Sequence, residues 1–110
     1  MTEKLDKQTC KPCVEGAEPL AADIIEKLKK QLPGGWKIED GHHLAKTFAF
    51  DNFQQALDFT NRVGEIAEAE NHHPEILLTW GKVEVRIWSH KADGLTENDF
   101  ILAAKADAKY

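Results

Sequence analysis

Two tight-turn signals constrain the fold of this chain more than any other feature of its sequence. Asp40-Gly41 and Gly81-Lys82 each separate a pair of short apolar runs. The flanking runs are 36–38 and 44–50 for the first signal, and 76–80 and 83–89 for the second. Short turns of this kind join neighbouring antiparallel strands, whereas parallel strands need long crossover connections. The sequence therefore predicts two β-hairpins and an antiparallel sheet.

Three segments with helical signals lie before, between and after these hairpins. The first follows Pro19, carries apolar residues at helical spacing and stops at the Pro-Gly-Gly of residues 33–35. The last follows Thr96, a predicted N-cap with Asp99 at the third helical position. The order helix, two strands, helix, two strands, helix predicts an α+β domain in which helices pack on an antiparallel sheet.

The middle helix has signals at both ends. Asp51, with Gln54 three residues later, predicts a capping box at its start. The helix should end close to Asn71, since His73 precedes a proline and is biased away from helical dihedral angles. We expect its buried stripe to comprise Phe53, Ala56, Leu57, Val63 and Ala67.

The alternation of side chains predicts which face of each strand is buried. The apolar face of the second strand carries Leu44, Phe48 and Phe50. In the last strand Val83, Val85 and Ile87 face one way, and Glu84, Arg86, Trp88 and His90 face the other.

Length and composition predict one domain. A chain of 110 residues, 42% apolar and 30% charged, can bury a core without additional staples. We assign residues 19–110 to this domain and residues 1–18 to an N-terminal arm. The net charge of −5 is spread along the chain and leaves no basic stripe for nucleic acid. No apolar run approaches the about 20 residues of a membrane helix, and no signal peptide is visible, so we expect a cytoplasmic protein without a membrane or nucleic-acid partner.

Both cysteines lie in the arm, in the motif Cys10-Lys11-Pro12-Cys13. Such a pair can be a redox site or half of a zinc knuckle. However, no strand precedes it, and no second cysteine pair exists to complete a four-ligand site. We interpret the motif as part of an unspecialised arm.

The candidate chemistry lies in the histidines. Glu68 and His72 are four residues apart, so they share a face if the helix persists, and a carboxylate bonded to one imidazole nitrogen makes the other a better base. Because Pro74 follows it, His73 is expected to have a non-helical backbone, which points its side chain in a different direction from that of His72. His90 lies at the end of the last predicted strand. Imidazoles exchange protons near neutral pH, so this set suits a reaction that needs an acid and a base together.

Other interpretations of the same residues stay open. Glu68 and His72 could be a solvated surface pair, and three histidines with an acid could bind zinc, although their spacing matches no familiar helical metal motif. A second pair, His42-His43, is predicted to consist of exposed turn residues.

One ordered series of residues carries a family resemblance. Glu68, His72-His73-Pro74, Trp80, His90 and Asp99 resemble the signature of the pterin-4a-carbinolamine dehydratases, in which an acidic residue stands four before His-His-Pro and an aromatic residue, a His and an Asp follow. The likeness covers roughly residues 20–104, and the arm with Cys10 is similar to that of many bacterial members.

The resemblance implies a four-stranded antiparallel sheet with three helices on one face, in agreement with the element order. It also implies that the protein eliminates water from 4a-hydroxytetrahydropterin, giving the quinonoid dihydropterin and recycling the cofactor of aromatic amino-acid hydroxylases. The pterin would be the substrate, with no metal and no other cofactor. A homodimer or homotetramer and a functional link to a phenylalanine hydroxylase are implied as well.

Site roles follow from the same resemblance. His72 and His90 would be the acid–base residues, one taking the proton of pterin N5 and the other protonating the departing hydroxyl. His73 would complete the catalytic set and, together with Pro74, would mainly bind and orient the pterin. Glu68 would steer His72, and Asp99 would support local structure or His90. Trp36 would pack near the pterin ring.

The chain departs from the family pattern at two positions. Many members have an acidic residue where this chain has Asn71 and an aromatic one where it has Ile76, which puts the preferred pterin side chain in doubt. The alternatives are a pterin-binding or protein-interaction module, like the animal members that serve as a dimerisation cofactor of a homeodomain protein, or a role in molybdopterin metabolism.

Overall fold

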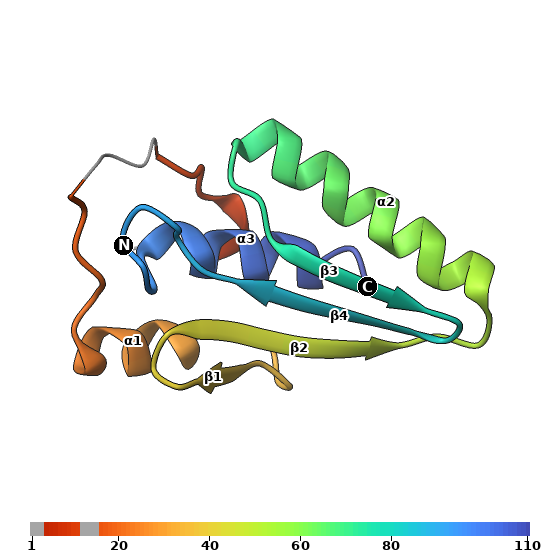
Figure 1. Ribbon diagram of the computed structural model, residues 1–110, viewed down its shortest axis with the longest axis horizontal. Coiled ribbons are helices and arrows are strands. Elements are labelled where there is room, and N and C mark those ends of the chain that lie inside the picture. The colour runs from red at the N-terminus through yellow and green to blue at the C-terminus, as the bar shows by residue number, and fades with distance from the viewer. Residues whose placement is uncertain (1–3, 12–15) are drawn as a thin grey trace.

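The two predicted hairpins form one four-stranded antiparallel sheet in the computed structural model, which describes residues 4–11 and 16–110. The elements are a short 3₁₀ helix η1 (Leu5–Lys7), α1 (Ala22–Lys29), β1 (Lys37–Glu39), β2 (His43–Ala49), α2 (Phe53–Glu70), β3 (Glu75–Thr79), β4 (Lys82–Ile87) and α3 (Glu97–Asp107) (Figure 1). The predicted α+β class and the order of helices and strands are confirmed.

The strands lie in the order β1-β2-β4-β3, so the second hairpin joins the first through its last strand. In the first turn, Asp40 and Gly41 adopt φ values of 54° and 62°, the left-handed conformation that Asp and Gly tolerate. In the second hairpin Thr79 pairs with Lys82, which places the two-residue turn at Trp80-Gly81, one residue before the predicted position.

The three helices pack on one face of the sheet, as predicted. In β4, Val83, Val85 and Ile87 are fully buried on that face, while Glu84 and Arg86 point to the open face. α2 contacts β3 and β4, and α3 contacts β4, α1, α2 and η1. Because other elements surround α3, most of its residues are buried.

Two predictions about α2 are wrong in detail. Its N-cap is Asn52, whose Oδ1 accepts the backbone N–H of Gln55 at 2.9 Å, one residue later than the predicted Asp51 box. Phe53, in the first turn, is 45% exposed and Leu57 is only partly buried, whereas Phe59 is fully buried and was missed. The buried stripe comprises Ala56, Phe59, Val63 and Ala67, at steps of three and four.

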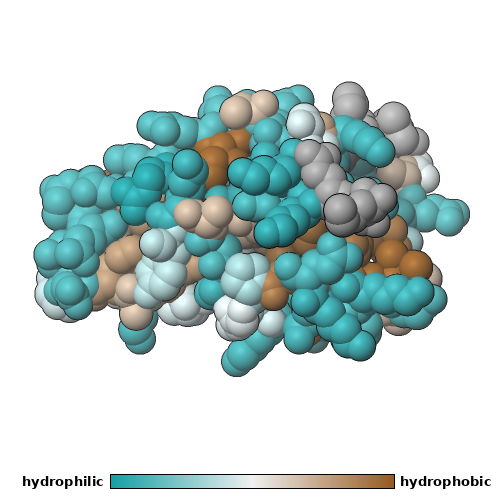
Figure 2. All heavy atoms as spheres, turned by 180° about the vertical axis from the view of Figure 1, so that it is seen from behind, coloured by the Kyte–Doolittle hydropathy of each residue, from teal (hydrophilic) through white to brown (hydrophobic). Residues whose placement is uncertain are grey.

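Part of the arm packs against the domain. Leu5 is buried in the core, and η1 lies against α3. Pro12 and Cys13 lie outside the described residues. The surface seen from behind the view of Figure 1 is mostly hydrophilic, with small separate hydrophobic areas (Figure 2). In the described part of the chain, no helix has the length and apolar character needed to span a membrane.

Candidate functional site

A buried histidine–carboxylate pair forms the centre of the candidate site. His72 follows α2, and its Nε2 lies 2.6 Å from Oδ1 of Asp99, in the first turn of α3. Asp99 is fully buried and His72 nearly so. The pair therefore joins two segments 27 residues apart in the chain in a place from which water is largely excluded.

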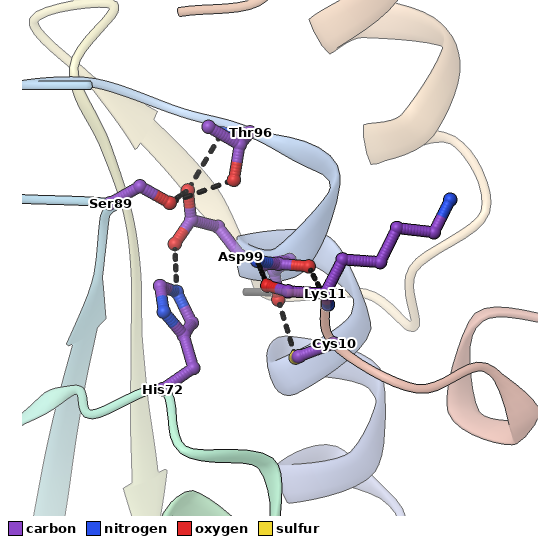
Figure 3. A network of polar contacts seen from close by, with 7 residues as sticks. Cys10, Lys11, His72, Ser89, Thr96 and Asp99 are labelled. Atoms are coloured by element: carbon purple, nitrogen blue, oxygen red, sulfur yellow. Dashed lines mark hydrogen bonds and ion pairs between the residues drawn. The ribbon is translucent and has the colours of Figure 1, made fainter. Parts of the chain in front are cut away.

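Asp99 is held by two further donors. Its Oδ2 accepts the Ser89 hydroxyl at 2.9 Å and the Thr96 backbone N–H at 2.8 Å (Figure 3). The second bond belongs to the predicted capping box of α3, with Thr96 as N-cap. One carboxylate thus caps a helix, accepts a hydrogen bond from the segment after β4 and orients His72.

This arrangement fixes the proton on the His72 ring. An ionised carboxylate can only accept hydrogen bonds, so Nε2 of His72 carries the proton that it donates to Asp99. In the neutral ring the lone pair is then on Nδ1, to which no described residue donates a hydrogen bond. His72 can accept a proton at Nδ1 and return it, while Asp99 stabilises the cationic form.

Glu68 pairs with His73, and the predicted pairing of Glu68 with His72 is wrong. α2 ends at Glu70, and Asn71 adopts the left-handed conformation with φ 52° as its C-cap. This turns the chain, so the four-residue helical spacing no longer applies to His72. His72 points into the protein, and His73, the next residue, places Nε2 against Oε2 of Glu68 at the surface. Asp99 supports local structure, as predicted, by capping α3, and the histidine that it bonds to is His72 rather than His90.

His90 lies three residues after the end of β4 and directly follows Ser89. Its ring is exposed and stacks on Trp88, with centroids 4.7 Å apart and an interplanar angle of 17°. The residue between them, Ser89, is buried and bonds to Asp99. His90 is therefore linked to the His72–Asp99 pair through the preceding residue, Ser89, which bonds to Asp99. No described contact joins the two histidine rings.

Trp36 lies in the hydrophobic core. It is 4% exposed, its Nε1–H donates to Asp107 Oδ2 at 2.8 Å, and its ring meets Phe48 edge-on. Lys46 bonds to the same carboxylate oxygen at 2.5 Å. The predicted contact of Trp36 with a pterin has no supporting contact here and stays a prediction, as does the role of Pro74, which fixes the backbone after His73.

His42 and His43 are not simple exposed turn residues, contrary to the prediction. Both are partly buried, and their rings lie 5.5 and 5.7 Å from that of Trp88. Sequence reasoning missed this group because its contacts join the first hairpin to the segment that follows β4, far away in the sequence. The sequence signal that could have revealed the group is the alternating pattern, which places the large ring of Trp88 on the open face of the sheet.

Cys10 is held beside the site rather than exposed to solvent. Its backbone N–H donates to Glu70 Oε1 at 2.7 Å, and its thiol lies 3.6 Å from the carbonyl oxygen of Asn98. Burial, followed by the charge of Glu70, raises the pKa of the Cys10 thiol to about 12. The thiol is therefore protonated at neutral pH, which disfavours a nucleophilic role.

The arm also bonds to the helix that carries Asp99. The Lys11 backbone N–H donates to Asn98 Oδ1 at 2.9 Å, and the Lys11 carbonyl accepts from Asn98 Nδ2 at 2.6 Å (Figure 3). Within residues 4–11 and 16–110, no three His, Cys, Asp or Glu side chains are grouped so that they could hold a metal ion.

Comparison with known proteins gives a consistent result. Residues 18–109 match the family described as Pterin 4 alpha carbinolamine dehydratase. A protein of Rubrobacter xylanophilus is 52% identical over 107 residues, covering 97% of this chain and 98% of that protein. One of Chlorobium limicola is 51% identical over 105 residues, covering 93% and 92%. Both carry the name "Putative pterin-4-alpha-carbinolamine dehydratase".

A solved structure shows the same fold. The transcriptional coactivator/pterin dehydratase from Brucella melitensis matches with a TM-score of 0.78 at 29% identity, over 84% of this chain and 98% of that one.

Proposed function

Because the chain belongs to the pterin-4-alpha-carbinolamine dehydratase family, we propose that it eliminates water from 4a-hydroxytetrahydropterin. In this reaction N5 of the pterin loses its proton, the bond between C4a and the hydroxyl oxygen breaks, and a C4a=N5 double bond forms. The products are water and the quinonoid dihydropterin. The protein would thereby recycle the cofactor of an aromatic amino-acid hydroxylase such as phenylalanine hydroxylase.

The buried His72–Asp99 pair is the observation that carries this proposal. The C4a hydroxyl group leaves poorly unless its oxygen is protonated so that it departs as water, and the electron pair that expels it comes from N5 as that atom is deprotonated. The reaction therefore needs a proton acceptor and a proton donor, each contributing typically about 10²–10⁴-fold. His72, with Nδ1 free of described partners and Nε2 fixed by Asp99, can serve as either.

His90 is our second acid–base residue, and His73 the residue that binds the pterin. His90 is exposed at the end of β4, adjacent to the serine that bonds to Asp99. His73 is exposed with Glu68 as its partner, so its remaining nitrogen, Nδ1, can bond to a polar edge of the ring. The reaction is an elimination without net oxidation, so these side chains supply what it requires, and we expect neither metal nor further cofactor.

A coupled assay tests the proposal. A phenylalanine hydroxylase generates the 4a-hydroxypterin in place, and absorbance follows its conversion to quinonoid dihydropterin with and without this protein. We expect acceleration over the spontaneous rate, with kcat reduced about 10²–10⁴-fold in His72→Ala and His90→Ala variants whose circular dichroism shows them folded. Unchanged turnover in His72→Ala would reject the acid–base assignment, and no acceleration by folded wild-type protein would reject the activity.

A binding role is the second candidate, because the Brucella protein is described as a coactivator as well as a dehydratase. Folded protein that binds a reduced pterin but does not accelerate dehydration would favour it. Acceleration only with a molybdopterin-type substrate would favour that branch of pterin metabolism.

We also propose that the protein is a cytoplasmic homodimer or homotetramer. β1 and β3 are the edge strands of the sheet, and edge strands are normally covered. Leu77 and Trp80, in and just after β3, are 59% and 69% exposed. Light scattering coupled to size-exclusion chromatography measures the mass directly, and a monomer at micromolar concentration would contradict this assignment.

A further inference from the structure

The ring of His90, an exposed candidate catalytic residue, stacks on the indole of Trp88. The indole and the His90 imidazole are nearly parallel, at 17° and 4.7 Å between centroids. No hydrogen bond to the His90 ring is found among the described residues. An exposed side chain without such a bond has several rotamers available, so contact with a large flat surface is what can restrict it.

Trp88 is itself held by a pair of histidines from the first hairpin. His42 Nδ1 lies 3.2 Å from His43 Nδ1, and both rings pack beside the indole. The outer nitrogens are fixed by carboxylates: His42 Nε2 lies 2.9 Å from Asp93, and His43 Nε2 lies 3.2 Å from Glu39.

These contacts tie together the two loops beside the indole. Asp93 belongs to the segment that carries His90, whereas Glu39 ends β1 and His43 begins β2. The bond from His42 to Asp93 therefore connects the first hairpin to the loop after β4. The group is not a part of the hydrophobic core, since Trp88 follows the exposed face of β4 and the buried face is filled by valine and isoleucine.

We propose that Trp88 is a positioning residue for His90, and that His42 and His43 support it. The indole fixes the orientation of the His90 imidazole for proton transfer to or from the pterin, while the two histidines keep the indole in place. This inference rests on the proposed dehydratase activity and extends it to three residues with no described hydrogen bond or ring contact to His72 or Asp99.

Removing the indole should lower turnover more than binding. In the coupled assay we expect Trp88→Leu to reduce kcat by about 10-fold or more, within the range of one misplaced acid or base, and to change KM little. Trp88→Phe keeps a flat ring and should recover most of kcat. Phe53→Leu is the matched control, because it removes a partly exposed aromatic ring from the first turn of α2 and should leave kcat unchanged.

A double-mutant cycle separates positioning from general structure. If Trp88 acts through His90, adding Trp88→Leu to His90→Ala should cause no further loss of kcat. An equal loss in both backgrounds would overturn the inference. So would full kcat in Trp88→Leu.

The stack has a readout that needs no substrate. The ring protons of His90 should show an upfield ring-current shift in NMR spectra, lost in Trp88→Leu and retained in Trp88→Phe, and weakened when His42 and His43 are both changed to Gln. Wild-type protein without dehydratase activity would reject the proposed function. Active wild type with an unshifted His90 resonance would reject only the positioning role.

Discussion

Replacing Asp99 with Asn should invert the hydrogen bonding of His72 while leaving the side-chain shape almost unchanged. The carboxylate accepts bonds from Ser89 and Thr96 at Oδ2 and from His72 at Oδ1. An amide has only one acceptor oxygen. Because two donors face Oδ2 and one faces Oδ1, the amide oxygen should take the Oδ2 position and the NH₂ group should face His72.

His72 must then accept a hydrogen bond at Nε2, which moves its proton to Nδ1. The nitrogen that should exchange a proton with the substrate can no longer accept one in the neutral ring, so we expect kcat to fall by about 10²–10⁴-fold. The free energy of unfolding should be affected less than the activation free energy of the reaction. All three hydrogen bonds keep a partner, but none is any longer to a charged group; a bond to a charged group contributes about 1.5–3 kcal/mol and a neutral one about 0.5–1.5 kcal/mol.

Three measurements check this chain of reasoning. Urea unfolding gives the free-energy change, the coupled assay gives kcat, and ¹⁵N chemical shifts of the imidazole give the His72 tautomer. Ser89→Ala is the matched control, because it removes one donor to Asp99 without touching the bond to His72, and it should cost less than about 10-fold in kcat. An Asp99→Asn protein that retains kcat, with the proton still on Nε2 of His72, would refute the argument.

Three further predictions concern single side chains. Glu68→Gln should change stability by less than about 1 kcal/mol, because its pair with His73 is exposed, and should raise KM for the pterin more than it lowers kcat; urea unfolding and steady-state kinetics measure the two effects. In a Cys13→Ser variant, Cys10 of the folded protein should react with iodoacetamide at pH 8 at least about 10-fold more slowly than Cys10 of the unfolded protein. Its reaction should become faster as the pH rises toward the Cys10 pKa of about 12. Equal rates in the folded and unfolded protein would contradict the raised pKa. Phe59→Ala should lower the free energy of unfolding by about 3–5 kcal/mol in a urea titration, since the ring is fully buried.

The sheet could be predicted because local patterns determine it. The period-2 alternation around Val83 and Val85 identified the buried face correctly, and Asp40-Gly41 formed the expected turn with both residues at positive φ. Boundaries were less certain. Asn52 took the N-cap that Asp51 was expected to form, because both side chains can cap a helix and the choice depends on neighbouring geometry.

The residues of the candidate site could be chosen from sequence, but not their pairing. Glu68 and His72 have the right spacing for one helical face, yet the left-handed Asn71 ends the helix between them. The true partner of His72 is 27 residues away and depends on how α3 packs, which no local pattern encodes. The support of Trp88 by His42 was missed for the same reason.

The docked arm has a consequence for the order in which the protein can complete its fold during synthesis. Cys10, Lys11 and the Asp6 carbonyl bond to residues 60, 87 and 99 positions further along the chain. At roughly 5–20 residues per second, the ribosome needs several seconds to make those partners after the arm has emerged. Throughout that interval Leu5 lacks the core that buries it. The arm residues are therefore made early in synthesis, but their contacts are among the last of the described contacts that can form.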